Sequence, residues 1–294
     1  MRDPSEKERR RARLAAARRL APLYDELAPG DLAAGVEWSA DGKASGLFLG
    51  TYSAAGLRRV VEHYGLDRLL AERGIEAFEV ELDTSDPFRH EVRLREPGGA
   101  TFLDLRARTA LGRDVGVSGR LGDLPCLVVE WLSLENPHAS FGPDRPPLPG
   151  QRRPGLGLAP EIEEVLVLAA RRVGAAALVS WPQWFHNAWL YHPRWRFVDP
   201  RESGRFAALV RDLAHLDLVR AAWAVHLGCV FDRRGRPYEW KPGPLALPRT
   251  REAARHFAAP GWRAARLAAK ARHAFVVDEA RLARELAARG VAPP

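Results

Sequence analysis

The chain has 294 residues, a net charge of +8 and two cysteines. This length suits one large domain or two modest ones, and an apolar content of 46% suffices for a core, while two cysteines exclude a disulfide framework. No apolar run reaches the ~20 residues needed to cross a bilayer, and the charged N-terminus has no apolar signal segment, so we expect a cytoplasmic protein with no membrane span.

Residues 1–45 are predicted to form a basic helix and a linker. The helix would cover Ser5–Leu27, with an arginine cluster at Arg9–Arg11 and a weak apolar stripe. A nucleic-acid arm is one interpretation of the cluster, and a solvated helix that packs by one face is the other. We favour the solvated helix because nearly all the basic residues are arginines spread along the chain, as a GC-rich genome produces. Nucleic-acid binding is therefore not expected.

Residues 46–200 are predicted to form a domain that begins with a strand, two helices and a meander. The expected elements are a strand at Leu47–Thr51, helices at Ala54–Tyr64 and Leu66–Arg73, and strands at Glu76–Leu82, His90–Arg95 and Thr101–Arg108. The three meander strands alternate apolar and charged residues, which is the period of a sheet with one exposed face. Pro97-Gly98-Gly99, between the last two strands, is a hairpin signal.

A glycine loop follows the next predicted strand, Pro125–Leu132. The loop runs Arg152-Arg153-Pro154-Gly155-Leu156-Gly157-Leu158 and opens into a predicted helix from Ala159 to Val173. Its glycines lack a Cβ, so the backbone can bend and a ligand can approach closely, and the free N–H groups at a helix start form an anion site. The sequence therefore predicts a phosphate-bearing ligand, with plain loop punctuation as the alternative.

After that helix we expect a buried strand at Ala176–Trp181, a helix at Trp184–Tyr191 and a short strand at Trp195–Val198. This order of elements, together with Arg152, Gly155 and Gly157, resembles the GNAT acetyltransferase superfamily, whose signature between its fourth strand and third helix is Arg/Gln-x-x-Gly-x-Gly/Ala. The resemblance implies a mixed central sheet flanked by helices, with acetyl-CoA or another acyl-CoA as co-substrate. It also implies that the coenzyme pyrophosphate is held by the loop, whose residues are Arg152, Arg153, Gly155, Leu156, Gly157 and Leu158.

The resemblance further implies an acid and a base for acyl transfer. A glutamate on the family's fourth strand can act as general base, and Glu130 has that place here. When Phe197 is aligned with the last phenylalanine of the family's helix pattern, Tyr191 and His192 fall on its Phe-Tyr pair. His192 then stands where a tyrosine often protonates the departing thiolate, with Tyr191 beside it. The same alignment puts Phe185 where asparagine is usual.

The alternation of residues along the predicted strand Pro125–Leu132 gives an independent argument about the role of Glu130. Strict alternation would place it on the face of Val128 and Leu132, where an apolar surrounding suits a base that works near neutrality. The alternative is a rim carboxylate paired with one of the many arginines.

The segment around Trp184–His192 is dense in aromatic and histidine side chains. The aromatic residues could line a pocket or fill a core. His186 and His192 are six positions apart and share no helix face, so no paired-histidine metal site is predicted. Each histidine is a candidate substrate contact or a structural residue. Upstream, the proline-rich segment Glu135–Gly150 is longer than the family's usual loop, and loops of this length are often functional or mobile.

Residues 201–294 are predicted to form a mainly helical extension with a hairpin. Helices are expected at Phe206–Leu216, at Val219–Leu227, within Arg251–Ala274 and at Asp278–Arg289, and the hairpin would join Gly228–Phe231 to Tyr238–Trp240. The expected fold class is α/β, with a GNAT-like mixed sheet over 46–200 and this extension. The expected function is acyl-CoA-dependent N-acylation of a small-molecule or protein amine. The alternative is a GNAT-fold binding or regulatory module without catalysis.

Overall fold

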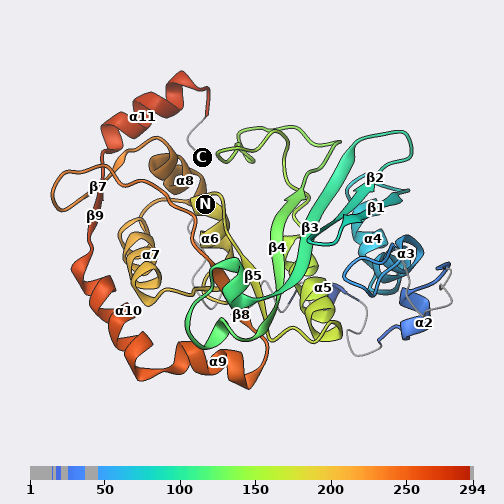
Figure 1. Cartoon of the computed structure of the whole chain (residues 1–294). Coiled ribbons are helices and arrows are strands. Elements are labelled where there is room, and N and C mark those ends of the chain that lie inside the picture. The colour runs from blue at the N-terminus through green and yellow to red at the C-terminus, as the bar shows by residue number, and fades with distance from the viewer. Residues whose placement is uncertain (1–14, 16–17, 21–25, 37–45, 292–294) are drawn as a thin grey trace.

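The computed structural model describes residues 15, 18–20, 26–36 and 46–291, and most of the basic helix predicted over Ser5–Leu27 lies outside them. The described part is a mixed α/β protein, which confirms the predicted fold class (Figure 1). Its helices are α2 (Pro29–Leu32), α3 (Ala54–His63), α4 (Leu66–Ala71), α5 (Ala159–Arg172), α6 (Phe185–Tyr191), α7 (Pro200–Asp212), α8 (Leu218–His226), α9 (Arg251–Ala258), α10 (Pro260–Arg272) and α11 (Glu279–Ala288). Its strands are β1 (Glu79–Asp86), β2 (Arg89–Arg95), β3 (Thr101–Leu111), β4 (Pro125–Leu134), β5 (Ala177–Ser180), β6 (Arg196–Phe197), β7 (Val230–Asp232), β8 (Leu245–Pro248) and β9 (Phe275–Val277). No helix among these residues is long and apolar enough to cross a bilayer.

The main sheet has the strand order β1-β2-β3-β4-β5-β8-β6. Neighbouring strands are antiparallel except β4 and β5, which run parallel because α5 carries the chain back between them. In this pair Cys126 lies opposite Ala177, and Val129 lies opposite Ser180. A separate two-stranded sheet consists of β7 and β9.

The predicted strand at Leu47–Thr51 is wrong, because this segment is a tight turn. Phe48 and Tyr52 bridge across it, and between them Leu49 and Gly50 have φ of 53° and 66°. Two successive left-handed residues reverse the chain, which a strand cannot accommodate.

The C-terminal segment does not stay apart from the main sheet. Strand β8 comes from a proline-rich stretch in which no strand is predicted, and it lies between β5 and β6 and pairs with both. The predicted hairpin is reduced to a single bridge between Phe231 and Pro237, and β7 pairs instead with β9. Pro237 has no N–H to extend a ladder, which explains why Tyr238–Trp240 forms no strand.

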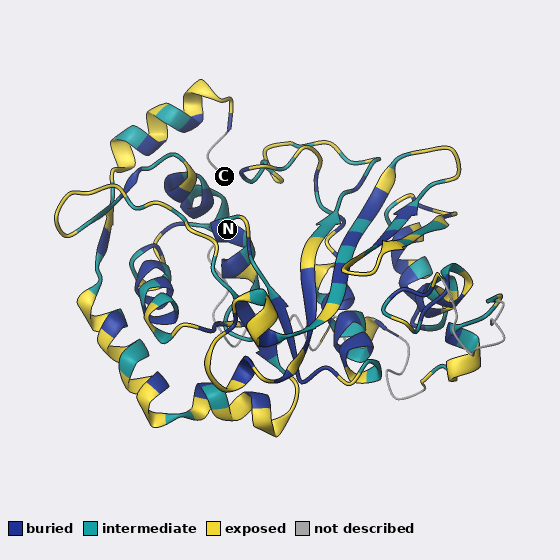
Figure 2. Cartoon of the chain, viewed as in Figure 1, coloured by how far each residue is buried: buried dark blue, intermediate teal, exposed yellow. Residues whose placement is uncertain are grey.

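The central strands β4 and β5 are largely buried (Figure 2), and their apolar side chains belong to two separate cores. One face contributes Leu127, Val129 and Leu178 to a large core that is covered by α3, α4, α5 and α7. The other face contributes Cys126 and Val128 to a smaller core that is completed by α9 and the start of α10. The central strands are therefore buried on both sides, which fixes their positions.

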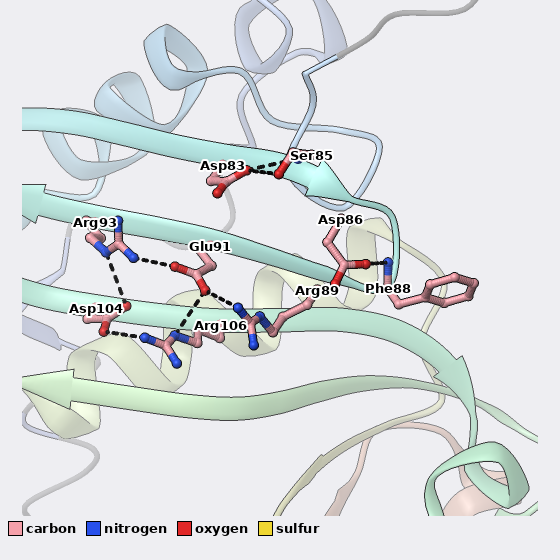
Figure 3. A network of polar contacts seen from close by, with 9 residues as sticks. All are labelled: Asp83, Ser85, Asp86, Phe88, Arg89, Glu91, Arg93, Asp104 and Arg106. Carbon is pink, nitrogen blue, oxygen red and sulfur yellow. Dashed lines mark hydrogen bonds and ion pairs between the residues drawn. The ribbon is translucent and has the colours of Figure 1, made fainter.

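The β2–β3 part of the sheet carries charged side chains in place of a second core (Figure 3). Glu91 on β2 is only 6% exposed and forms ion pairs with Arg89, Arg93 and Arg106. Asp104 on β3 lies 3.9 Å from Arg93 and 3.5 Å from Arg106. A carboxylate that loses its water needs such partners, so this face of the sheet is stabilised by ion pairs.

Candidate functional site

Strand β5 is shorter than its parallel neighbour β4. Their pairing ends at Val129 and Ser180, while β4 continues to Leu134. The edge of β4 is met next by the loop that precedes α5, where Glu135 bridges to Gly155. The part of β4 beyond Val129 is thus not paired with β5, and it lies between their last pair and the glycine loop. This is the carboxyl end of the parallel strands, where open α/β sheets bind ligands.

The two glycines of the loop have different roles. Gly157 has a φ of +68°, and a Cβ added there would meet no atom within 4 Å. Gly155 has no positive φ, and a Cβ added there would lie 3.2 Å from the carbonyl oxygen of Leu134. Gly157 therefore supplies a turn beside open space, as a ligand position requires, whereas Gly155 lets the loop approach β4.

Two arginines hold the loop by its carbonyl groups. Arg73 donates from Nε to the carbonyl oxygen of Leu156 at 2.5 Å, and Arg145 donates to that of Gly155. The N–H and C=O of a trans peptide point in opposite directions, so the amide of Gly157 points away from Arg73. In the part of the chain that the structure describes, this amide has no hydrogen-bond partner.

The other loop residues divide into buried and exposed ones. Leu156 and Leu158 are buried, and the Leu156 amide already donates to the carbonyl oxygen of Leu134 at 3.2 Å. Arg152 and Arg153 are exposed and make no ion pair with any described residue. The loop thus offers one open amide and two available guanidinium groups, a smaller set than the sequence predicts.

The first turns of α5 already contain carboxylates with partners. Glu161 is 1% exposed and lies 3.2 Å from Arg19. Glu163 accepts hydrogen bonds from Arg194 at 2.6 Å and from the indole N–H of Trp195 at 2.8 Å. These carboxylates already offset part of the partial positive charge at the N-terminus of α5. The positive charge that attracts a bound anion would therefore come mainly from the exposed arginines.

Glu130, the predicted base, is the extra residue of a β-bulge. On β3, Arg106 pairs with Trp131 and Ala107 pairs with Val129, which leaves Glu130 without a partner in the register. A bulge bends its strand and is common beside active sites. The bulge at Glu130 directly follows Val129, the last residue of β4 that pairs with β5.

The bulge also corrects the predicted face of Glu130. Val128 packs into the smaller core and Leu132 against the larger one, so they lie on opposite faces and simple alternation does not run through Glu130. The Glu130 side chain is 31% exposed, and its Oε1 accepts a hydrogen bond from Nε of Arg108 at 2.7 Å. It is the arginine-paired rim carboxylate of the alternative interpretation.

The two predicted acids lie at the C-terminal end of α6. Burial, and then Glu163, raise the pKa of Tyr191 to about 12. The ring of His192 packs edge-on against Phe206, with 5.7 Å between the centroids. Neither Tyr191 nor His192 lines the cavity described below, and Glu130 does not line it either. None of the three predicted catalytic residues is therefore part of the wall of that cavity.

The proline-rich segment Glu135–Gly150, here named the strap, is attached to the C-terminal helices. Trp223 on α8 donates from Nε1 to the carbonyl oxygen of Pro147 at 2.8 Å. Gly150 has a φ of +80° and packs on Trp184 so closely that an added Cβ would lie 2.5 Å from the indole ring. The strap thus runs from the end of β4 to α8 and the start of α6.

A cavity of about 260 Å³ lies beside the strap. It is lined by Pro149, by Gln183–His186 at the start of α6, by the end of α8, and by Tyr238–Trp240. His186 is 4% exposed, and its Nδ1 has no hydrogen-bond partner among the described residues. Burial, and to a lesser degree His226, lower the pKa of His186 to about 4, so the ring is neutral at neutral pH.

Only some of the residues that line this cavity could be identified as candidates from the sequence. His186 and the aromatic residues of α6 were candidates, whereas no motif pointed to Gln183 or Glu239. Glu239 lines the cavity because the chain turns back after β7. The turn residues in the sequence indicate that the chain reverses, but they do not indicate what the segment after the turn packs against.

No protein-family model matches the chain, and a search of curated proteins finds no match. A functional assignment therefore depends on the residues and their geometry.

Proposed function

We propose that the protein is a cytoplasmic N-acyltransferase that uses acetyl-CoA or another acyl-CoA and acts on a small-molecule or protein amine. The observation that carries this proposal is the glycine loop at the carboxyl end of parallel strands β4 and β5, where Gly157 has open space at its Cβ position and its amide has no hydrogen-bond partner among the described residues. The GNAT superfamily, which the sequence resembles, places its thioester between splayed strands and its pyrophosphate on such a loop.

The proposed roles follow from that arrangement. Arg152, Arg153 and the Gly157 amide would bind the pyrophosphate, because all three are exposed at the start of α5. In the reaction the amine nitrogen attacks the thioester carbonyl carbon, the C–S bond breaks, and the thiolate takes up a proton. Glu130 would accept the proton of the amine, and Tyr191 or His192 would supply one to the thiolate.

A matched pair of substitutions at Gly157 tests the loop. Asparagine and aspartate have nearly the same shape, and both tolerate a positive φ better than other residues do. Aspartate also suits a helix start, so G157D should fold at least as well as G157N. If the loop binds pyrophosphate, G157D should weaken acetyl-CoA binding at least about tenfold more than G157N in calorimetry, through repulsion between like charges. Equal affinities in the two folded variants would remove the coenzyme from this loop.

A binding module without catalysis is the second candidate, and the pairing of Glu130 with Arg108 favours it. The absence of Glu130, Tyr191 and His192 from the lining of the described cavity supports it as well. The two functions differ in turnover. A transferase releases free coenzyme thiol when it is given acetyl-CoA and an amine, whereas a binding module binds acetyl-CoA in calorimetry and releases none.

A further inference from the structure

The described residues that line the cavity beside the strap include one carboxylate, Glu239, and no lysine or arginine. Glu239 is exposed and makes no ion pair with a described residue. The histidines do not offset this charge, because burial is the largest cause that lowers the pKa of both His186 and His226. Arg289, which also acts on His226, is engaged with Glu285 at 2.5 Å. In a chain with a net charge of +8, the described cavity lining thus has a carboxylate and no permanently cationic side chain.

Aromatic rings form much of the cavity wall. Trp184, Phe185, Tyr238 and Trp240 all line it. Two of these rings are fixed in place, since Trp240 donates from Nε1 to the Pro182 carbonyl oxygen at 3.2 Å and Trp184 is packed against Gly150. The negative faces of aromatic rings attract cations, most strongly in tryptophan.

We infer that this cavity binds a small organic cation, an ammonium group carried on an aromatic or apolar body. The ammonium would pair with Glu239 and lie near the tryptophan faces, and the body would fill the aromatic wall. His186 lines the cavity, and Nδ1 of its neutral ring, which is buried and has no hydrogen-bond partner in the described part of the chain, is an acceptor for an N–H of a ligand that inserts beside this ring. A buried polar atom without a partner is costly, and such a ligand would remove that cost.

The size of the cavity limits the ligand. A volume of about 260 Å³ holds roughly nine water molecules, since each occupies ~30 Å³ of the liquid, so a ligand of about ten non-hydrogen atoms fits. Phenethylamine has this size and chemistry. The further step, that the bound cation is the acyl acceptor, rests on the proposed function. The inference that the cavity binds a cation does not rest on the proposed function, and cation binding is measured without coenzyme.

The experiment is calorimetric titration of the full chain with phenethylamine and with 2-phenylethanol, which has the same shape but no charge. We expect the amine to bind at least about tenfold more tightly than the alcohol. E239Q should abolish most of that preference, because it removes the charge and keeps the shape of the side chain. The matched control is E76Q, at another exposed carboxylate without an ion pair among the described residues, and it should bind like the unmodified protein.

Absence of phenethylamine binding, equal affinity for amine and alcohol, or an E239Q variant that behaves like E76Q would each overturn the inference. The outcomes of this experiment can also be told apart from those of the experiment on the coenzyme loop. Loss of acetyl-CoA binding in G157D with intact cation binding supports both proposals. Cation binding without any acetyl-CoA binding to the unmodified protein would remove the proposed function and leave the cavity as a cation site.

Discussion

At the scale of single residues, the chemistry open to Glu130 depends on Arg108. The guanidinium group occupies Oε1 of the carboxylate at 2.7 Å, while Oε2 has no hydrogen-bond partner among the described residues. A general base needs a lone pair within hydrogen-bond reach of the proton that it removes. The ion pair therefore leaves half of the carboxylate available and fixes its orientation at the bulge.

Two substitutions separate a base from a structural ion pair at this position. If Glu130 is the base, E130Q should lower the turnover rate by ~10²–10⁴ and spare coenzyme affinity, whereas R108Q, which keeps the carboxylate, should retain most of the rate. If the pair is only structural, the two variants should lose a similar small amount of stability, about 1 kcal/mol or less for an exposed pair, and neither should change turnover. Steady-state kinetics and urea denaturation of both variants decide between these outcomes.

His186 gives a prediction for the pH dependence of stability. Its pKa is lowered from 6.5 to about 4 in the folded state, mainly by burial. Between these values the unfolded chain binds a proton that the folded chain does not, so the free energy of unfolding should fall as the pH is lowered from 6.5 towards 4, by at most about 3 kcal/mol. Urea denaturation at pH 7 and pH 5 measures the slope.

In H186Q this part of the slope should disappear. The control H215Q, at an exposed histidine, should keep it. A slope unaffected by H186Q would mean that His186 does not titrate as the buried environment requires.

At the scale of elements, strong local patterns predicted most of the structure. The meander and α5 lie where periodicity placed them, because each has an apolar face with the period of its element, and β5 lies where a short apolar run predicts a buried strand. β8 was missed because four residues among prolines show no period, and its pairing with β5 is a long-range contact. The bulge was missed for a related reason. An extra residue at Glu130 shifts the alternation of β4 without changing the residue types that the sequence displays.

The strap gives a prediction at this scale. Gly150 combines a φ of +80° with a packed Trp184 ring, so G150A should lower the free energy of unfolding by about 2–3 kcal/mol through strain and overpacking. Gly142, in the same segment, has open space around it and no positive φ, so G142A should change stability by about 0.5 kcal/mol or less. Equal effects in denaturant melts would show that the strap does not pack on α6 as described.

At the scale of the whole molecule, the sheet joins the two regions that the sequence separates at residue 200. β8 comes from the C-terminal region and supplies both the neighbour of β5 and the partner of β6. Leu245 and Leu247 on β8 enter the large core together with Leu178 on β5. The cavity has the same mixed origin, since α6 and the strap form one side and α8 with Tyr238–Trp240 form the other. The C-terminal region is thus part of the fold that carries the candidate site.

A truncated chain of residues 1–200 should therefore fail to fold. Without β8, the buried edge of β5 and the apolar face of β6 would be exposed to water, and an unpaired apolar edge favours aggregation. A chain ending at Asp278 is the matched comparison, because it lacks α11 but keeps every strand of the main sheet. It should lose the burial of Leu282 and Leu286, at a cost of about 2–5 kcal/mol, yet still unfold cooperatively. Thermal melts followed by circular dichroism distinguish the two chains. A cooperative transition in the 1–200 chain would show that the C-terminal region is an appendage, and that β8 is dispensable to the sheet.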